Sequence, residues 1–182
     1  FGIKSSYGSI AKRLRARSFL VNTLLEAVSH YICHSFDVPL NNILMSAGGK
    51  FYLLLPFTEQ SESKLSGLSR EIERFLFKKS SGVISLNMAY EKASGKELES
   101  FNSLLSGLSG KLEKKKARKF ENILIADGRW NEDRFILDND LSGKTVCKSC
   151  GSSLADAEGE GICRNCADDI SIGRKLANAR FI

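Results

Sequence analysis

The sequence predicts an α+β fold, in which a unit of alternating helices and short strands is followed by a small cysteine-rich lobe. Over residues 11–36, apolar residues recur every three or four positions, as on one face of a helix. Two short apolar runs flank a glycine turn at residues 47–49, which is typical of a β-hairpin. Four cysteines stand in two C-x-x-C pairs beyond residue 146. These three observations define the expected organisation.

The remaining elements of the first unit follow from periodicity. The helix over 11–36 should end before Pro39, because proline forces its predecessor out of the helical region. The hairpin comprises strands at 42–46 and 51–55, and helical spacing returns over 61–79. Residues 83–90 alternate apolar and polar side chains, which predicts a half-buried strand.

The order helix, strand, strand, helix, strand indicates a ferredoxin-like arrangement. If residues 1–3 are the end of an earlier strand, the unit is a βαββαβ palm whose first strand is mostly missing. We therefore expect a palm-type domain over residues 1–94.

Residues 95–182 are expected to form a second, small helical and zinc-ribbon domain. Residues 96–119 have helical spacing, but Gly107 and Gly110 predict a kinked or two-piece helix. Short strands are expected at 122–126 and 134–137, leading into a metal site within 143–170.

The four paired cysteines predict a structural zinc site. Two C-x-x-C knuckles separated by twelve residues supply the tetrahedral thiolate shell that zinc prefers, and four thiolates leave no open position for a substrate. Gly151, Gly159 and Gly161 give the chain the freedom that tight knuckle turns need. Two disulfides or an iron–sulfur cluster are the alternatives. The proposed zinc ligands are Cys147, Cys150, Cys163 and Cys166.

Charge divides the chain unevenly. Residues 1–120 hold 19 Lys and Arg against 10 Asp and Glu, whereas residues 121–182 hold 8 against 11. Positive charge at the start of a helix is unfavourable, so a phosphate partner would offset the cluster there; a solvated basic turn is the alternative. The candidate nucleic-acid-binding residues are Lys12, Arg13, Arg15 and Arg17.

The sequence favours a cytoplasmic protein without a membrane segment. The longest wholly apolar stretch, residues 51–55, is too short to span a bilayer, and no export leader is recognisable. Cys33 lies outside the paired pattern, and the other four cysteines have paired spacing. This cysteine usage fits a reducing compartment.

The glycine hairpin bears on catalysis. Nucleotide-polymerising palms carry Gly-Gly followed by paired acids, which hold the divalent metals. Here Lys50 and Phe51 occupy the acidic positions, and a lysine cannot hold magnesium. We therefore expect no catalytic residue in this hairpin.

Four segments, in order, resemble the large subunit of type III-A (Csm-type) CRISPR effector complexes. They are residues 15–19, 42–56, the four cysteines and 172–180. The resemblance covers nearly the whole chain and implies the first palm and the zinc-containing linker domain of a longer protein with a second, Gly-Gly-Asp-Asp palm.

The resemblance implies a function in antiviral defence. The intact family protein uses a guide RNA to detect foreign transcripts, cleaves single-stranded DNA and, as a nucleotidyltransferase, makes cyclic oligoadenylate from ATP with Mg²⁺ or Mn²⁺. Implied partners are the other effector subunits, guide and target RNA, and ATP shared with the second palm. By the same resemblance, Ser46, Gly48 and Gly49 are expected to contact a nucleotide but to take no further part in catalysis. This chain alone is not expected to be an enzyme. The alternative hypothesis is a zinc-ribbon nucleic-acid-binding protein.

Overall fold

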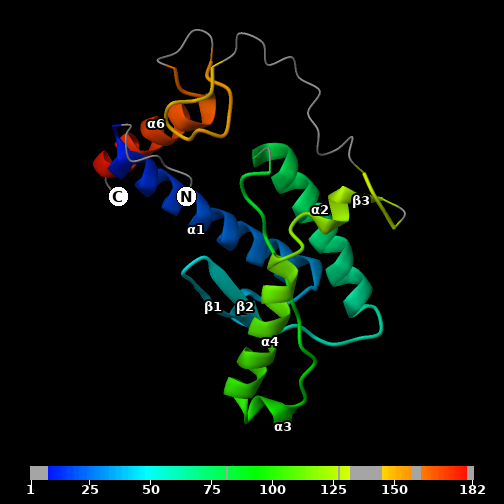
Figure 1. Ribbon diagram of the computed structural model, residues 1–182. Coiled ribbons are helices and arrows are strands. Elements are labelled where there is room, and N and C mark those ends of the chain that lie inside the picture. The colour runs from blue at the N-terminus through cyan, green and yellow to red at the C-terminus, as the bar shows by residue number, and fades with distance from the viewer. Residues whose placement is uncertain (1–7, 81, 127, 132–144, 157–160, 180–182) are drawn as a thin grey trace. The chain divides into compact units, whose positions relative to one another are not determined.

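The structure, a computed structural model, describes residues 8–80, 82–126, 128–131, 145–156 and 161–179 of the 182-residue chain. It separates into two compact units, Phe1–Leu54 with Asn139–Ile182, and Leu55–Asp138 (Figure 1). The predicted boundary after residue 94 falls inside the second unit, and the division into a palm and a linker domain stays a prediction. Among the described residues, no helix is long and apolar enough to cross a bilayer.

The first unit is built on one long helix, α1 (Ile10–Ser35), which confirms the helix expected at 11–36. The helix ends in a Schellman motif, because Asp37 adopts a left-handed φ of 54° and the Val38 N–H reaches the Cys33 carbonyl at 3.0 Å. Its buried face includes Leu25, Val28 and Ile32.

The predicted hairpin is confirmed as β1 (Ile43–Ala47) and β2 (Lys50–Leu53), preceded by the 3-10 turn η1 (Leu40–Asn42). The strands pair antiparallel from Ile43 opposite Leu53 to Ala47 opposite Lys50, with a bulge between Ile43 and Met45. Gly48 and Gly49, at φ 61° and 80°, form a two-residue turn of the type that suits a twisted hairpin. The hairpin packs along α1 (Figure 1).

The same unit contains the four paired cysteines, within the described residues 145–156 and 161–166, which we call the cysteine lobe. It also contains α6 (Arg164–Asn178), a helix that the sequence patterns did not predict. Figure 1 shows α6, in red and orange, beside the N-terminal part of α1, and the two helices are in contact. This contact joins segments about 150 residues apart in the sequence.

The second unit contains α2 (Ser61–Ser80), which confirms the helix predicted at 61–79. Phe77 of α2 packs edge-on against Phe120, with ring centroids 5.2 Å apart, beside the buried Ile123 and Leu124. The helix predicted at 96–119 is in two pieces, α3 (Gly95–Leu98) and α4 (Phe101–Lys116). The break lies just before α4, whereas Gly107 and Gly110 lie within α4.

Two strand predictions in this unit were wrong. Residues 83–90 form neither helix nor strand, and neither of the two sheets in the described part of the chain includes them. Most of 122–126 lies in the short helix α5 (Glu121–Leu124), and only β3 (Ile125–Ala126) pairs with β4 (Arg129–Trp130). The strand expected at 134–137 and the strand end at 1–3 lie outside the described residues. The fold is therefore α+β, with two small two-stranded antiparallel sheets in the described part of the chain.

Candidate functional site

The four paired cysteines converge on one point. Cys163 caps the start of α6 and Cys166 lies in its first turn, while Cys147 and Cys150 come from the preceding loop. The four sulfurs lie within 4.8 Å of one another, with 3.8 Å between Cys147 and Cys166 and 3.9 Å between Cys150 and Cys163. Zinc–sulfur bonds of about 2.3 Å in a tetrahedron require sulfur–sulfur distances of about 3.8 Å. The cluster therefore has the size of a tetrahedral metal site.

The alternative of two disulfides does not fit this geometry. All four cysteines are free thiols, and a disulfide would bring two sulfurs to about 2 Å. The Cys163 N–H donates to the Cys147 sulfur at 3.2 Å, which suits a sulfur that carries negative charge. Cys147, Cys163 and Cys166 are at most 5% exposed, so water has little access to the cluster.

Local backbone conformation explains why the sequence folds into these knuckles. Gly151 and Gly161 have φ of 71° and 78°, a conformation that other residues rarely adopt. Val146 and Leu154 form an antiparallel bridge around the first knuckle, and the Lys148 N–H donates to the Gly161 carbonyl, which joins the two knuckles. These local bonds bring together two cysteine pairs that are separated in the sequence.

The protein environment shifts the pKa values of the thiols in opposite directions. Burial opposes ionisation of Cys150, but hydrogen bonds from the hydroxyl and backbone of Ser152 and from the backbone of Ser153 outweigh it and lower its pKa to about 5. Burial raises the pKa of the Cys166 thiol to about 12, although the nearby charge of Arg13 acts in the other direction. A bound cation would hold all four sulfurs as thiolates.

Arg13 of α1 is buried against this cluster. Its side chain is fully inaccessible, and its guanidinium donates to the Ser149 carbonyl at 3.0 Å and to the Cys166 sulfur at 3.3 Å. In the described part of the chain Arg13 forms no ion pair with a carboxylate, and its Nε has no hydrogen-bond partner. Among the described residues, the hydrogen bonds of the buried guanidinium therefore go to a carbonyl and a sulfur.

The helices α1 and α6 meet at Gly173. A Cβ atom at this position would lie 1.9 Å from the Lys12 carbonyl oxygen, so only glycine allows the two backbones to approach this closely. Polar contacts continue along the junction: Arg15 donates to the Gly173 carbonyl at 2.9 Å, and Arg17 pairs with Asp169 at 2.6 Å. We call the contact of α1 with α6, Arg13 included, the α1–α6 junction.

The junction accounts for most of the basic cluster proposed to bind nucleic acid. Arg13, Arg15 and Arg17 all contact the cysteine lobe or α6, so the basic start of the helix has partners within its own unit. Lys12 is half-buried and contributes its carbonyl oxygen to the close approach of Gly173. Nucleic-acid binding by this cluster stays a prediction.

A second candidate surface lies between α1 and the hairpin. An open groove of about 560 Å³ is lined by Ser46, Ala47 and Gly48 from the hairpin and, from α1, by residues that include Glu26, Ser29 and His30. It contains two of the three residues expected to contact nucleotide, and Gly49 is their neighbour at the turn. Gly48 and Gly49 have open space around the position of a Cβ atom. On the hairpin side, the groove therefore presents backbone and the small side chains of Ser46 and Ala47, whereas the α1 side carries larger side chains such as Glu26 and His30.

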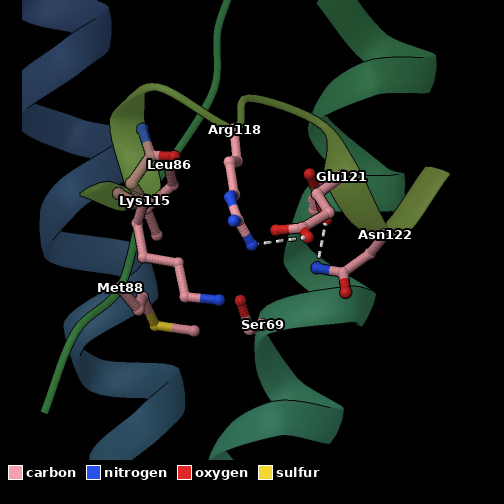
Figure 2. A pocket seen from close by; sticks show the side chains of 9 residues that line it. Ser69, Leu86, Met88, Lys115, Arg118, Glu121 and Asn122 are labelled. Atoms are coloured by element: carbon pink, nitrogen blue, oxygen red, sulfur yellow. Dashed lines mark hydrogen bonds and ion pairs between the residues drawn. The ribbon is translucent and has the colours of Figure 1, made fainter. Parts of the chain in front are cut away.

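A small pocket in the second unit is less suited to a ligand. Figure 2 shows the Lys115 side chain pointing toward Ser69 and the Arg118 side chain pointing toward Glu121. Arg118 pairs with Glu121 at 3.3 Å, and the buried Glu73 accepts a hydrogen bond from Asn122 at 2.6 Å. The cavity of about 30 Å³ has room for about one water molecule. Because Arg118, Glu121 and Glu73 already have partners and the volume is small, the pocket carries no functional assignment.

Comparison with known proteins identifies the family. The family model described as Csm1 subunit domain B matches residues 2–128, so the chain belongs to the Csm1 family of type III-A CRISPR systems. It is 30% identical over 174 residues to a protein of Enterococcus italicus described as the CRISPR system single-strand-specific deoxyribonuclease Cas10/Csm1 (subtype III-A). A protein of Methanocaldococcus jannaschii with the same description is 27% identical over 194 residues.

The matched region is a limited part of each relative. The alignments cover 93% and 98% of this chain but 22% and 24% of the relatives. Among solved structures, the apo Csm1-Csm4 cassette matches with a TM-score of 0.60 at 23% identity, over 75% of this chain and 20% of that one. The Csm1-Csm4 cassette in complex with cA4 matches with a TM-score of 0.58 at 24% identity, over the same shares. The family resemblance inferred from the sequence is therefore confirmed, and the solved structures share its fold.

Sequence reasoning missed two parts of the site. The segment 172–180 was noted as a motif, but its glycine was not recognised as the contact point with α1. The burial of Arg13 also went unnoticed, because only the folded chain brings it to cysteines more than 130 residues away. The basic start of one helix and a glycine in another helix far along the sequence give no local signal that the two helices touch.

Proposed function

We propose that this chain provides a non-catalytic palm and a structural zinc lobe within the large subunit of a type III-A CRISPR effector complex. The intact protein would cleave single-stranded DNA and make cyclic oligoadenylate from ATP, with Mg²⁺ or Mn²⁺ held by a second palm. The observation that carries the proposal is the match to the Csm1 family over most of the chain, together with a hairpin whose tip ends in Lys50 and Phe51.

Zinc is the metal that the cysteine lobe fits best. An all-sulfur, closed site with tetrahedral dimensions suits zinc, and it leaves no coordination position for substrate. Bound there, zinc would cross-link the two knuckles and offset part of the negative charge of the thiolates. It would not take part in a reaction. Its role would be to fold the lobe and fix α6.

Nucleotide contact is proposed for Ser46, Gly48 and Gly49. The exposed turn lets a base or phosphate approach the backbone closely, and the groove beside it has the volume of a small-molecule site. Without acidic side chains at the tip, the hairpin would position ATP for the acids of the second palm. Catalysis by this chain alone is not part of the proposal.

Partners are proposed from the relatives. The solved structures with this fold pair Csm1 with Csm4, and one of them also holds cA4, which supports assembly with other effector subunits. Guide and target RNA remain candidate partners for the outward faces of Lys12, Arg15 and Arg17, whereas Arg13 is fully buried.

Two assays test this function. Incubated with ATP and Mg²⁺, this chain should give no oligoadenylate, whereas a longer protein that includes the second palm should give it; turnover by this chain alone would contradict the proposal.

In NMR titrations with ATP, amide shifts should concentrate at Ser46, Gly48 and Gly49, with the amide of Gly110 in α4 as an unaffected reference. Shifts spread evenly over both units would remove the nucleotide assignment.

A further inference from the structure

Arg13 is the one fully buried cation that the described residues place against the metal cluster. It reaches the cluster from α1, a helix separated from the cysteines by more than 130 residues of sequence. Burying a guanidinium without a counter-ion is strongly unfavourable, and Arg13 has no carboxylate partner among the described residues. Its position therefore requires negative charge from another source.

A zinc ion held by four thiolates has that charge. Four negative sulfurs and one divalent cation leave a net charge of two negative units in a closed site. The guanidinium lies 3.3 Å from the Cys166 sulfur and is fixed on its other side by the Ser149 carbonyl, within the first knuckle. One side chain thus contacts both C-x-x-C segments.

We propose that Arg13 is the built-in counter-ion of the zinc–thiolate centre and that it makes metal binding depend on the docking of α1. The proposal rests on the zinc site proposed above and adds a role for a residue outside the cysteine lobe. Arg13 acts through the sulfur, so it is a positioning and charge-balancing residue, not a metal ligand. Hydrogen-bond partners of metal ligands typically change metal affinity by about 10–100-fold when they are removed.

The geometry of the junction favours this role over simple packing. Gly173 brings the α6 backbone against Lys12, the residue next to Arg13, and so holds the guanidinium at the cluster. Arg15 donates to a backbone carbonyl of α6 instead of a sulfur. Arg15 is therefore a matched control, because it lies on the same helix and contacts the same junction without touching the metal site.

The test compares three variants of the full chain, R13K, R13Q and R15Q, by competition with a chromophoric zinc chelator. If the positive charge is what matters, R13Q should lose about tenfold or more in zinc affinity, while R13K and R15Q stay within a few-fold of the unmodified chain. Equal affinity of R13Q and the unmodified chain, or weaker binding by R13K than by R13Q, would overturn the proposal.

Cobalt substitution gives a second readout that packing alone would not move. A positive charge near a sulfur stabilises its lone pair, so the thiolate-to-cobalt charge-transfer band should shift to longer wavelength in R13Q and stay in place in R15Q. An unshifted band in R13Q would contradict the role of Arg13. Failure of the unmodified chain to bind zinc or cobalt at all would instead refute the metal site itself, so the two failures are distinguishable.

Discussion

The α1–α6 junction and the glycine hairpin use the same residue type for opposite purposes. At the junction, Gly173 removes a side chain so that two helix backbones can touch, since an added Cβ atom would lie only 1.9 Å from the Lys12 carbonyl oxygen. At the hairpin, Gly48 and Gly49 adopt left-handed φ angles with open space around them. The junction is closed and held by buried polar contacts, whereas the hairpin borders an open groove. The junction is therefore suited to holding α1 and α6 together, and the hairpin is suited to contact with a ligand.

The largest effect is expected when one of the four cysteines proposed to bind zinc is replaced. Cys163→Ser should reduce bound zinc from one ion per chain to none, because a serine hydroxyl is a poor zinc ligand and structural sites contribute folding energy directly. Metal analysis and thermal unfolding would measure it. Cys33→Ser is the control, since Cys33 is a buried free cysteine outside the cluster; if it lost zinc as completely, the four-cysteine assignment would fail.

The next largest effect is expected at the helix contact. Gly173→Ala should destabilise the first unit by roughly 3 kcal/mol, because the new methyl group would overlap backbone atoms that cannot rotate away. Gly110→Ala within α4 has open space at the same position and should stabilise its helix by up to about 1 kcal/mol. Urea unfolding of both zinc-loaded variants measures the difference, and equal stabilities would contradict the close approach.

A smaller effect is expected for the ion pair at the junction. Asp169→Asn removes one charge from the Arg17–Asp169 pair, whose side chains are only 15% and 13% exposed, and should cost about 1–2 kcal/mol. Asp168→Asn changes an exposed neighbour and should have little effect. Unfolding at low and high salt would separate them; a similar loss in both variants would show that the pair contributes nothing specific.

The smallest effect is expected at the hairpin turn. Gly48→Ala should cost about 1 kcal/mol, because a side chain is strained at a φ of 61° even where space is available. Gly48→Asn should cost less, because asparagine tolerates this conformation and suits such turns. Thermal unfolding ranks the variants, and a loss as large as that of Gly173→Ala would mean that the turn is packed and not open.

The sequence predicted the elements whose signals are local. Regular apolar spacing defined α1 and α2, the glycine pair defined the hairpin, and cysteine spacing defined the candidate metal ligands. The strand expected at 83–90 failed because alternation shows a half-buried surface but not a pairing partner. The short helix α5 was mistaken for a strand because an apolar run of this length is compatible with either structure.

The candidate site was predictable only as far as its ligands. The contact of Arg13 with Cys166 spans 153 positions, and the approach of Gly173 to Lys12 spans a similar separation. The residue types alone did not predict these contacts. A basic helix start resembles a phosphate-binding surface, and a glycine within a helix resembles a weak point of that helix. Only tertiary structure distinguishes a charge that faces the cysteine cluster from one that faces solvent.

The central claim is that zinc in the cysteine lobe supports α1, and hydrogen exchange with and without a zinc chelator tests it most directly. Removal of zinc should accelerate exchange in the described part of the cysteine lobe, in α6 and in the N-terminal half of α1, where α6 docks. The β1–β2 hairpin should keep its exchange rates, because its hydrogen bonds are internal. Unchanged protection of α1 after complete removal of zinc would contradict the account.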